Sequence, residues 1–146
     1  MSKKETLQDV SVLATSKNGL HFLTANDWAL IADKAARVQF KAGDVIVRKG
    51  KSPDGLYLLV KGAAAAQLTG LGKSIEIGPG EVCGEISFID ERPATVDVVA
   101  REMVDALYLD RPTVQSLFEL FPHLGSRFYR SLASSLSRRL RELIGP

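Results

Sequence analysis

The sequence predicts one mainly β domain framed by helices, and three observations support that fold class. Nine glycines between residues 38 and 110 separate short β-branched and aliphatic runs, which is the usual pattern of strands joined by turns. On either side of that region, apolar residues recur at the spacing of amphipathic helices. The chain has 146 residues, 45% of them hydrophobic and 25% charged, so it can bury one sizeable core and is not expected to be disordered.

Residues 1–37 are expected to form a helical lead-in. Thr24 is followed three residues later by Asp27, a spacing that resembles a capping box at the start of a helix. One face of the helix that follows carries Trp28, Ile31, Ala32 and Ala35. The lead-in therefore offers an apolar surface that a β-core can cover.

Residues 38–110 are expected to form the β-core, with strand lengths that suit a small sandwich or barrel. Gly62 and Gly70 flank the alanine run Ala63–Ala66 and leave room for less than two helical turns. We therefore predict a strand there, despite the high helix propensity of alanine. The predicted strands cover residues 38–41, 45–48, 56–60, 63–68, 74–77, 96–100 and 106–109.

Residues 111–146 return to the helical pattern. Pro112 suits the first turn of one helix, and Pro122 ends that helix and can begin another. The second helix is expected to be long and amphipathic, with an apolar stripe opposite arginines that we expect to be solvated. The stripe holds Leu124, Phe128, Leu132, Leu136, Leu140 and Leu143, and the arginines are Arg127, Arg130, Arg138, Arg139 and Arg141. Because the stripe can pack on its own core or on a second copy, a homodimer through this helix is one expectation.

Composition disfavours several classes of function. A net charge of +2 is too weak to predict nucleic-acid binding. Cys83 has no disulfide partner and is expected to be a buried small hydrophobe, while His21 and His123 lie too far apart to suggest a metal site. The first ten residues include Lys3, Lys4, Glu5 and Asp9 and no apolar run, and no uncharged run in the sequence approaches the ~20 residues of a membrane span. A cytoplasmic protein without membrane contact is expected.

The stretch from residue 78 to residue 100, GPGEVCGEISFIDERPATVDVVA, holds the most informative polar residues. A glycine-rich turn leads into a short helix, where the free amides of Ile86 and Ser87 would favour an anion such as a phosphate. Glu85, directly after Gly84, could accept hydrogen bonds from vicinal hydroxyls, and Arg92 could bind phosphate oxygens. Together these groups would complement a sugar phosphate. No metal set, triad or acid and base pair is evident, so catalysis is not expected.

Three stretches of the β-region, FKAGDVIVRKGKSPDGLYLLVKGAA, IGPGEVCGEISFIDERPATVDVVA and ALYLDR, carry a family resemblance. They resemble the cyclic nucleotide-binding domain of catabolite-activator-type regulators, protein kinase A regulatory subunits and cyclic-nucleotide-gated channels. The resemblance implies one domain over residues 1–146, built as an eight-stranded antiparallel jelly-roll β-barrel. It also implies an N-terminal helical segment, a short phosphate-cassette helix and two C-terminal helices.

The family's phosphate-binding cassette begins in this sequence at Cys83, Gly84 and Glu85. The resemblance implies roles for the residues of this cassette and leaves two registers open for its end. In the family, the glutamate that Glu85 matches takes the ribose hydroxyl and a later arginine takes the cyclic phosphate. A register without gaps, which we favour, places Ala94 at that arginine and Asp97 at a threonine, and the extra carboxylate would repel a phosphate. The rival register needs a deletion and an insertion, and it makes Arg92 the phosphate ligand, with Ala94 and Thr95 after it.

The leading hypothesis is a regulatory module that binds cAMP or cGMP and repositions its C-terminal helix to signal to an unknown effector protein. The implied ligand-binding residues are Gly84, Glu85, Ile86, Ser87, Arg92, Ala94 and Thr95, with no catalytic residue, metal or cofactor. The alternative is a degenerate domain of the same fold that binds no nucleotide and serves as a dimerisation or protein-interaction module. The sequence ends before a helix-turn-helix could follow, so DNA binding is not expected.

Overall fold

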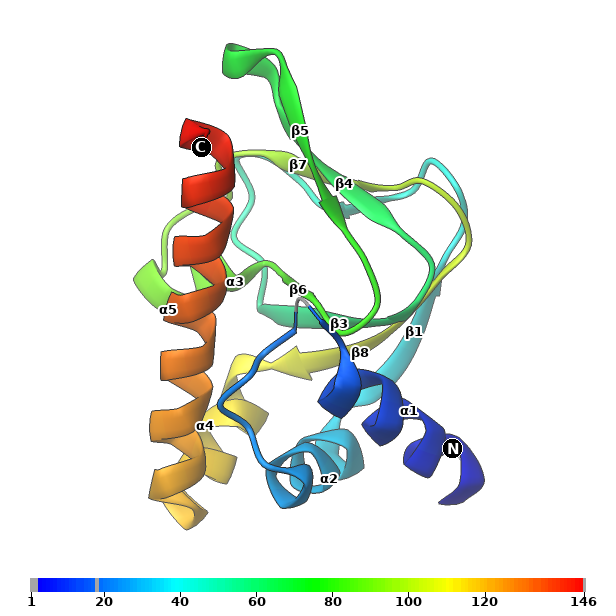
Figure 1. Ribbon diagram of the computed structural model, residues 1–146, viewed down its shortest axis with the longest axis vertical. Coiled ribbons are helices and arrows are strands. Elements are labelled where there is room, and N and C mark those ends of the chain that lie inside the picture. Colours follow the sequence, from blue (N-terminus) through cyan, green and yellow to red (C-terminus); the bar gives the residue numbers. More distant parts are fainter. Residues whose placement is uncertain (1–2, 18, 146) are drawn as a thin grey trace.

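The computed structural model describes residues 3–17 and 19–145, in which helices cover one side of a β-core (Figure 1). The helices and strands follow one another as α1 (Lys3–Thr15), α2 (Ala25–Lys34), β1 (Ala36–Phe40), β2 (Val45–Val47), β3 (Gly55–Lys61), β4 (Ala64–Leu68), the 3₁₀ turn η1 (Thr69–Leu71), β5 (Lys73–Ile77), β6 (Val82–Cys83), α3 (Glu85–Asp90), β7 (Asp97–Ala100), β8 (Val104–Asp110), α4 (Arg111–Leu120) and α5 (Pro122–Ile144).

The strands form two four-stranded sheets, in the orders β1-β8-β3-β6 and β2-β7-β4-β5, and every pairing is antiparallel. The prediction of eight antiparallel strands with flanking helices is confirmed, and the helices hold more residues than the strands. Closure of the two sheets into a barrel stays a prediction. The β-region begins at Ala36, two residues before the expected residue 38, and it ends at the expected Asp110.

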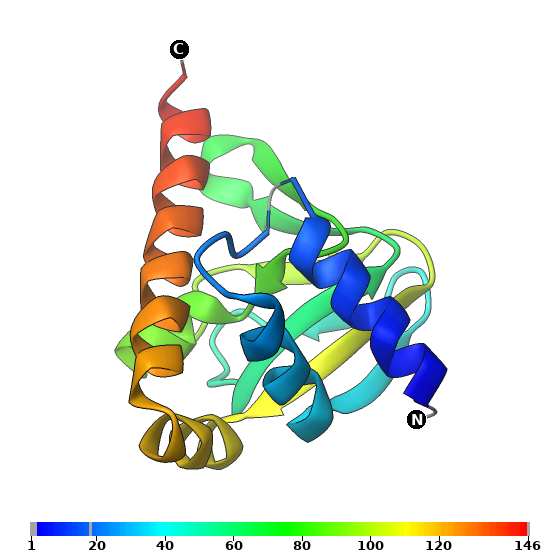
Figure 2. The same cartoon turned by 60° about the horizontal axis from the view of Figure 1, so that its bottom comes forward.

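Strand β3 is buried on both faces, because a helical layer covers one side and the second sheet covers the other. Leu56, Leu58 and Val60 pack into a core that includes Trp28 of α2, as the alternation of side chains along a strand requires. Leu59 faces the opposite way, into the core between the sheets. Figure 2 shows α1 and α2 lying across this sheet.

The start of α2 confirms the predicted capping box. The hydroxyl of Thr24 accepts a hydrogen bond from the Asp27 amide at 3.1 Å, and the Asp27 carboxylate accepts one from the Thr24 amide at 3.0 Å. The same carboxylate accepts two hydrogen bonds from Arg127 of α5, at 2.6 and 2.8 Å. A helix start near the N-terminus is thereby joined to the last helix of the chain.

The alanine run forms a strand, as predicted. Alternation along β4 turns Ala64 and Ala66 toward the space between the sheets, opposite Ile77 and Ile75 of β5. Methyl side chains fill little of that space. The small residues of β4 therefore leave room inside the molecule, next to the cassette.

The two C-terminal helices begin where their prolines predict. Asp110 caps α4 by accepting a hydrogen bond from the Thr113 amide at 2.8 Å, and Pro112 lies in the first turn. Pro122 starts α5, which runs along one side of the molecule (Figure 1). Within the described ranges, none of the helices is both long and apolar enough to cross a membrane.

Candidate functional site

A cavity of about 380 Å³ lies between the second sheet, the cassette helix α3 and the second half of α5. Strand β4 borders the cavity with Leu68 and with Ala66, whose methyl side chain leaves space there. Its lining is mostly apolar and consists of Val47, Ala66, Leu68, Ile75, Ile77, Cys83, Gly84, Glu85, Ile86, Ser87, Ala94, Thr95, Val96, Val98, Leu136, Arg139, Leu140 and Leu143. A concave, mostly apolar space with a few polar groups is the usual form of a small-molecule site.

Gly84 sets the direction in which the chain enters this cavity wall. Its φ of 89° lies in the left-handed region, which glycine adopts without the steric penalty that other residues meet. The turn it makes starts α3 at the next residue and places Glu85 inside the protein, with 5% of its surface exposed. The pairing of Gly84 and Glu85 that the sequence singled out thus serves to bury a carboxylate.

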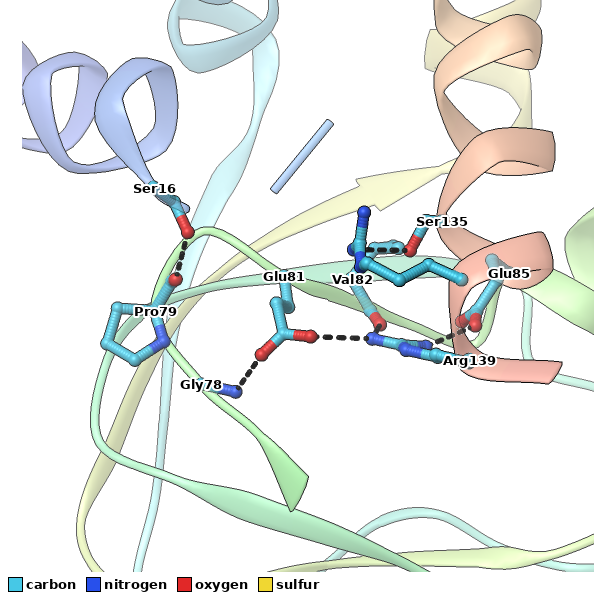
Figure 3. A network of polar contacts seen from close by, with 9 residues as sticks. Ser16, Gly78, Pro79, Glu81, Val82, Glu85, Ser135 and Arg139 are labelled. Carbon is cyan, nitrogen blue, oxygen red and sulfur yellow. Dashed lines mark hydrogen bonds and ion pairs between the residues drawn. The ribbon is translucent and has the colours of Figure 1, made fainter. Parts of the chain in front are cut away.

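The buried carboxylate of Glu85 is paired with Arg139 of α5. Nη1 of Arg139 donates a hydrogen bond to Oε1 of Glu85 at 2.6 Å, and only 8% of the Arg139 surface is exposed (Figure 3). A carboxylate and a guanidinium removed from water require partners of this kind, because each would otherwise lose its solvation without compensation. The contact fastens α5 to the cassette across 54 residues of sequence.

The second terminal nitrogen of Arg139, Nη2, binds groups other than Glu85. Nη2 donates to the carbonyl oxygen of Val82 at 3.1 Å and to Oε1 of Glu81 at 3.4 Å, so the arginine lies between two carboxylates (Figure 3). Glu81 is itself oriented by the Gly78 amide, which donates to Oε2 at 2.8 Å. Nε of Arg139 is buried and has no hydrogen-bond partner among the described residues.

Burial determines the acid–base behaviour of the groups in the wall. Loss of solvation raises the pKa of the Glu85 carboxyl above its ordinary value, and the neighbouring Arg139 guanidinium limits that rise. Burial also raises the pKa of the Cys83 thiol far above its usual range. Cys83 is 1% exposed, which confirms the expectation of a small buried hydrophobe, and a thiol held in this form is a poor nucleophile.

Six of the seven predicted ligand residues border the cavity, whereas Arg92 does not. The six are Gly84, Glu85, Ile86, Ser87, Ala94 and Thr95. Arg92 is exposed and borders a separate surface hollow with Asp54, Asp110 and Arg111, among others. Asp97 begins β7, outside the lining, and its carboxylate accepts a hydrogen bond from the Lys49 amide at 2.7 Å. The position that the register without gaps matches to the family's arginine is thus an alanine at the cavity wall.

The structure corrects one prediction about α5. Arg139 was expected on a solvated face opposite the leucine stripe, and this is wrong because its side chain points into the protein. The sequence contains the signal: Arg139 follows Leu132 by seven residues and Leu136 by three, so it belongs to the same helical face as the stripe. The other arginines differ among themselves, since Arg127 pairs with Asp27 and Arg130 stacks over the Phe22 ring at 3.9 Å.

The second half of α5 covers the cavity, and the β4–β5 hairpin lies beside its last turn. Leu136, Leu140 and Leu143 are the helix residues of the lining, together with Arg139. Nζ of Lys73, at the start of β5, donates to the carbonyl oxygen of Leu143 at 3.2 Å and so occupies a free acceptor at the helix end. Figure 2 shows the hairpin beside the C-terminal end of α5.

Fold and site together define a two-sheet β fold in which the last helix lies over a mostly apolar cavity. The sequence model of the cyclic nucleotide-binding domain matches residues 37–120, more than half of the chain. The chain therefore belongs to the cyclic nucleotide-binding domain family. That family consists of regulatory binding domains.

Individual relatives agree with this assignment. The chain is 28% identical over 130 residues to cyclic GMP-binding protein C of Dictyostelium discoideum, covering 86% of this chain and 5% of that protein. It is 32% identical over 84 residues to the cAMP-dependent protein kinase regulatory subunit of Emericella nidulans, covering 57% of this chain and 20% of that protein. A cyclic nucleotide-binding domain from Methylobacillus flagellatus has the same fold, with a TM-score of 0.79 at 20% identity, covering 96% of this chain and 80% of that one. The chain thus spans a small part of both curated relatives.

Proposed function

We propose that the chain is a regulatory module that senses a small molecule in the cavity and reports its presence through α5. One observation carries this proposal: the helix that closes the cavity also binds the cavity's carboxylate, through Arg139. A ligand that enters must contact Leu136, Leu140 or Arg139, so its contacts differ between two positions of the helix. Such a difference is the physical requirement for a ligand to shift a conformational equilibrium.

The two halves of α5 are held differently, which suits this role. Leu124, Phe128 and Leu132 in the first half are buried in the core that also contains Trp28. In the second half, Leu140 is 57% exposed and Ile144 is 77% exposed. A movement confined to the second half would therefore break few apolar core contacts, its main cost would be the contact between Arg139 and Glu85, and the first half would serve as its fixed support.

Cyclic nucleotides are the first ligands to test, since the names of the relatives refer to cyclic GMP and cAMP. Glu85 matches the family's ribose ligand in both registers, and the register without gaps matches Ala94 to its phosphate-binding arginine; both residues border the cavity. The output would go to an effector protein, in keeping with the name of the regulatory subunit among the relatives.

A second candidate function is a protein-interaction module of the same fold that binds no ligand. It is favoured by Ala94, which supplies no charge for a phosphate, and by the exposed apolar residues Leu140 and Ile144 at the end of α5. In that case the end of the helix would join a second copy of the chain, and the chain would form a homodimer in solution.

The test combines binding with a measurement on α5. Cyclic AMP, cyclic GMP and the uncharged dye N-phenylnaphthylamine are titrated into the folded protein by calorimetry. Hydrogen exchange is then compared, with and without each compound, for residues 136–144 and for residues 122–134. We expect a bound compound to change exchange in 136–144 and to leave 122–134 unchanged. A compound that binds in the cavity without any change in α5, or the failure of all three to bind, contradicts the sensing role. Failure of all three with a dimer in analytical ultracentrifugation supports the second candidate.

A further inference from the structure

The charges around the cavity favour one class of ligand over another. Of the described residues that line the cavity, Arg139 alone carries a positive charge, and both of its terminal nitrogens are already bonded. Its partners are two carboxylates, those of Glu85 and Glu81, whose side chains are 6% and 13% exposed. When both carboxylates are ionised, this cluster has a net charge of −1, and protonation of one brings it to zero. The described side chains of the cavity wall therefore have no surplus positive charge to offer an anion, and the amides of Ile86 and Ser87 at the start of the short helix α3 contribute only a partial charge.

The region that would face a phosphate is neutral as well. Ala94, Thr95 and Val96 form that part of the lining, and Arg92 borders a different hollow. An anion that entered would lose part of its hydration and would find no unpaired cation among the described residues of the lining. Burial of an uncompensated charge is among the largest penalties known in protein interiors.

The same wall is well suited to a neutral molecule. Most of its side chains are aliphatic, from Val47 on β2 to Leu143 on α5. The Thr95 and Ser87 side chains can each donate or accept one more hydrogen bond.

We propose that the ligand of this cavity is uncharged, with a compact apolar body and one or a few oxygen-containing groups, and that anionic ligands are rejected. This inference rests on the sensing role proposed above and names the class of molecule that is sensed. Selection arises from charge, because Arg139 is already neutralised by Glu85 and Glu81 and no second cation of the part of the chain that the structure describes borders the space.

Two dyes that differ mainly in one charge provide the test. N-phenylnaphthylamine is neutral, and anilinonaphthalene sulfonate has the same aromatic skeleton with an added sulfonate. Fluorescence titration of the wild-type protein is expected to show saturable binding of the neutral dye, at least about tenfold tighter than binding of the anionic dye, because the sulfonate must be buried without a cation. Ala66→Phe, which fills the cavity, is expected to abolish binding of the neutral dye. Leu71→Ser, which removes an apolar side chain that is 65% exposed and lies outside the lining, is expected to leave it unchanged.

A matched pair of variants tests charge directly. Ala94→Arg supplies a cation at the cavity wall, and Ala94→Met adds a neutral side chain of similar length. We expect anionic dye and cAMP to bind Ala94→Arg at least about tenfold tighter than Ala94→Met, since only the former compensates the anion. Circular dichroism and thermal melting show that each variant is folded.

The outcomes distinguish failure of the neutral-ligand inference from failure of the sensing role. Equal affinity of the wild-type protein for the two dyes, or displacement of the neutral dye by cAMP or cGMP, overturns the neutral-ligand inference and leaves the sensing role intact. Binding of the neutral dye without a change of hydrogen exchange in residues 136–144 overturns the sensing role, while the charge selection still stands. Failure of both dyes to bind the folded wild-type protein overturns both.

Discussion

At the scale of single residues, Arg139 provides the cation that pairs with the buried Glu85 carboxylate. Glu85 is surrounded by apolar groups, and a carboxylate in that position is stable in its ionised form only when a cation is close. The cation comes from a helix turn that the sequence places 54 residues away. The ligand residue at which the family resemblance points is thus already engaged within the chain.

Replacement of Arg139 should therefore destabilise the protein strongly. Arg139→Met keeps the length of the side chain but leaves the Glu85 carboxylate buried without a partner, which we expect to cost about 3 kcal/mol of unfolding free energy. Arg141→Met changes an exposed arginine of the same helix and should cost less than about 0.5 kcal/mol. Urea unfolding measures both. Adding Glu85→Gln to Arg139→Met should restore part of the loss, and an additive double variant would show that the pair is not coupled.

The pKa of Glu85 makes a separate prediction about pH. Because burial raises the pKa in the folded state above the ordinary glutamic acid value of about 4.3, the folded protein holds the proton more tightly than the unfolded chain does. The stability gained from this proton is complete below the unfolded pKa and is lost as pH rises through the folded pKa. We expect the difference in unfolding free energy between wild type and Glu85→Gln to shift against the wild type over that rise. Urea unfolding at a series of pH values measures it, and a shift in favour of the wild type would show that Arg139 outweighs burial.

At the scale of elements, most of the fold follows from the sequence pattern, and the exceptions have physical causes. The capping box of α2, the proline starts of α4 and α5 and the strand formed by the alanine run are all present as predicted. Strand β6 was not predicted, because its two residues are too few to show alternation, and their pairing with β3 defines them. The direction of Arg139 was wrong because the charge of the residue was given more weight than its position on the helix. Which residues of the cassette face the cavity depends on the turn after α3, and one sequence does not define that turn.

The contact between strands β3 and β8 depends on a residue that has no side chain. A Cβ added at Gly55 would lie 2.1 Å from the Leu109 carbonyl oxygen and 2.7 Å from the Asp110 Cα, and both are backbone atoms that cannot move aside alone. We expect Gly55→Ala to cost about 3 kcal/mol, since the strands must separate. Gly70→Ala, where no atom lies within 4 Å of the added carbon, is the matched control and should change stability by less than about 0.5 kcal/mol. A Gly55→Ala protein as stable as the control in thermal unfolding would contradict this close approach.

At the scale of the whole molecule, α5 links parts of the chain that are far apart in sequence. Arg127 bonds the start of α2, Arg139 bonds the cassette, and the last turn accepts a hydrogen bond from Lys73 of the β4–β5 hairpin. The first of these contacts is far from the cavity and the other two border it. A ligand can therefore act on the second half of the helix while the contact between Arg127 and α2 keeps the first half in place.

The contact between Arg127 and Asp27 should make the unfolding free energy decrease as the pH becomes acidic. The hydrogen bond from Arg127 is the main cause that holds the pKa of the Asp27 carboxyl below its ordinary value of about 4. The stability it provides is present above the unfolded pKa of Asp27 and is lost as pH falls through the lowered folded pKa. We expect Arg127→Met to reduce the unfolding free energy by about 1–2 kcal/mol near neutral pH, because Asp27 is 2% exposed and keeps only its hydrogen bonds within the cap. The difference between wild type and Arg127→Met should shrink below about pH 4 in urea unfolding, whereas Arg141→Met should match the wild type throughout. A difference that stays constant down to the acid transition would show that Arg127 acts through packing of its side chain and not through its charge on Asp27.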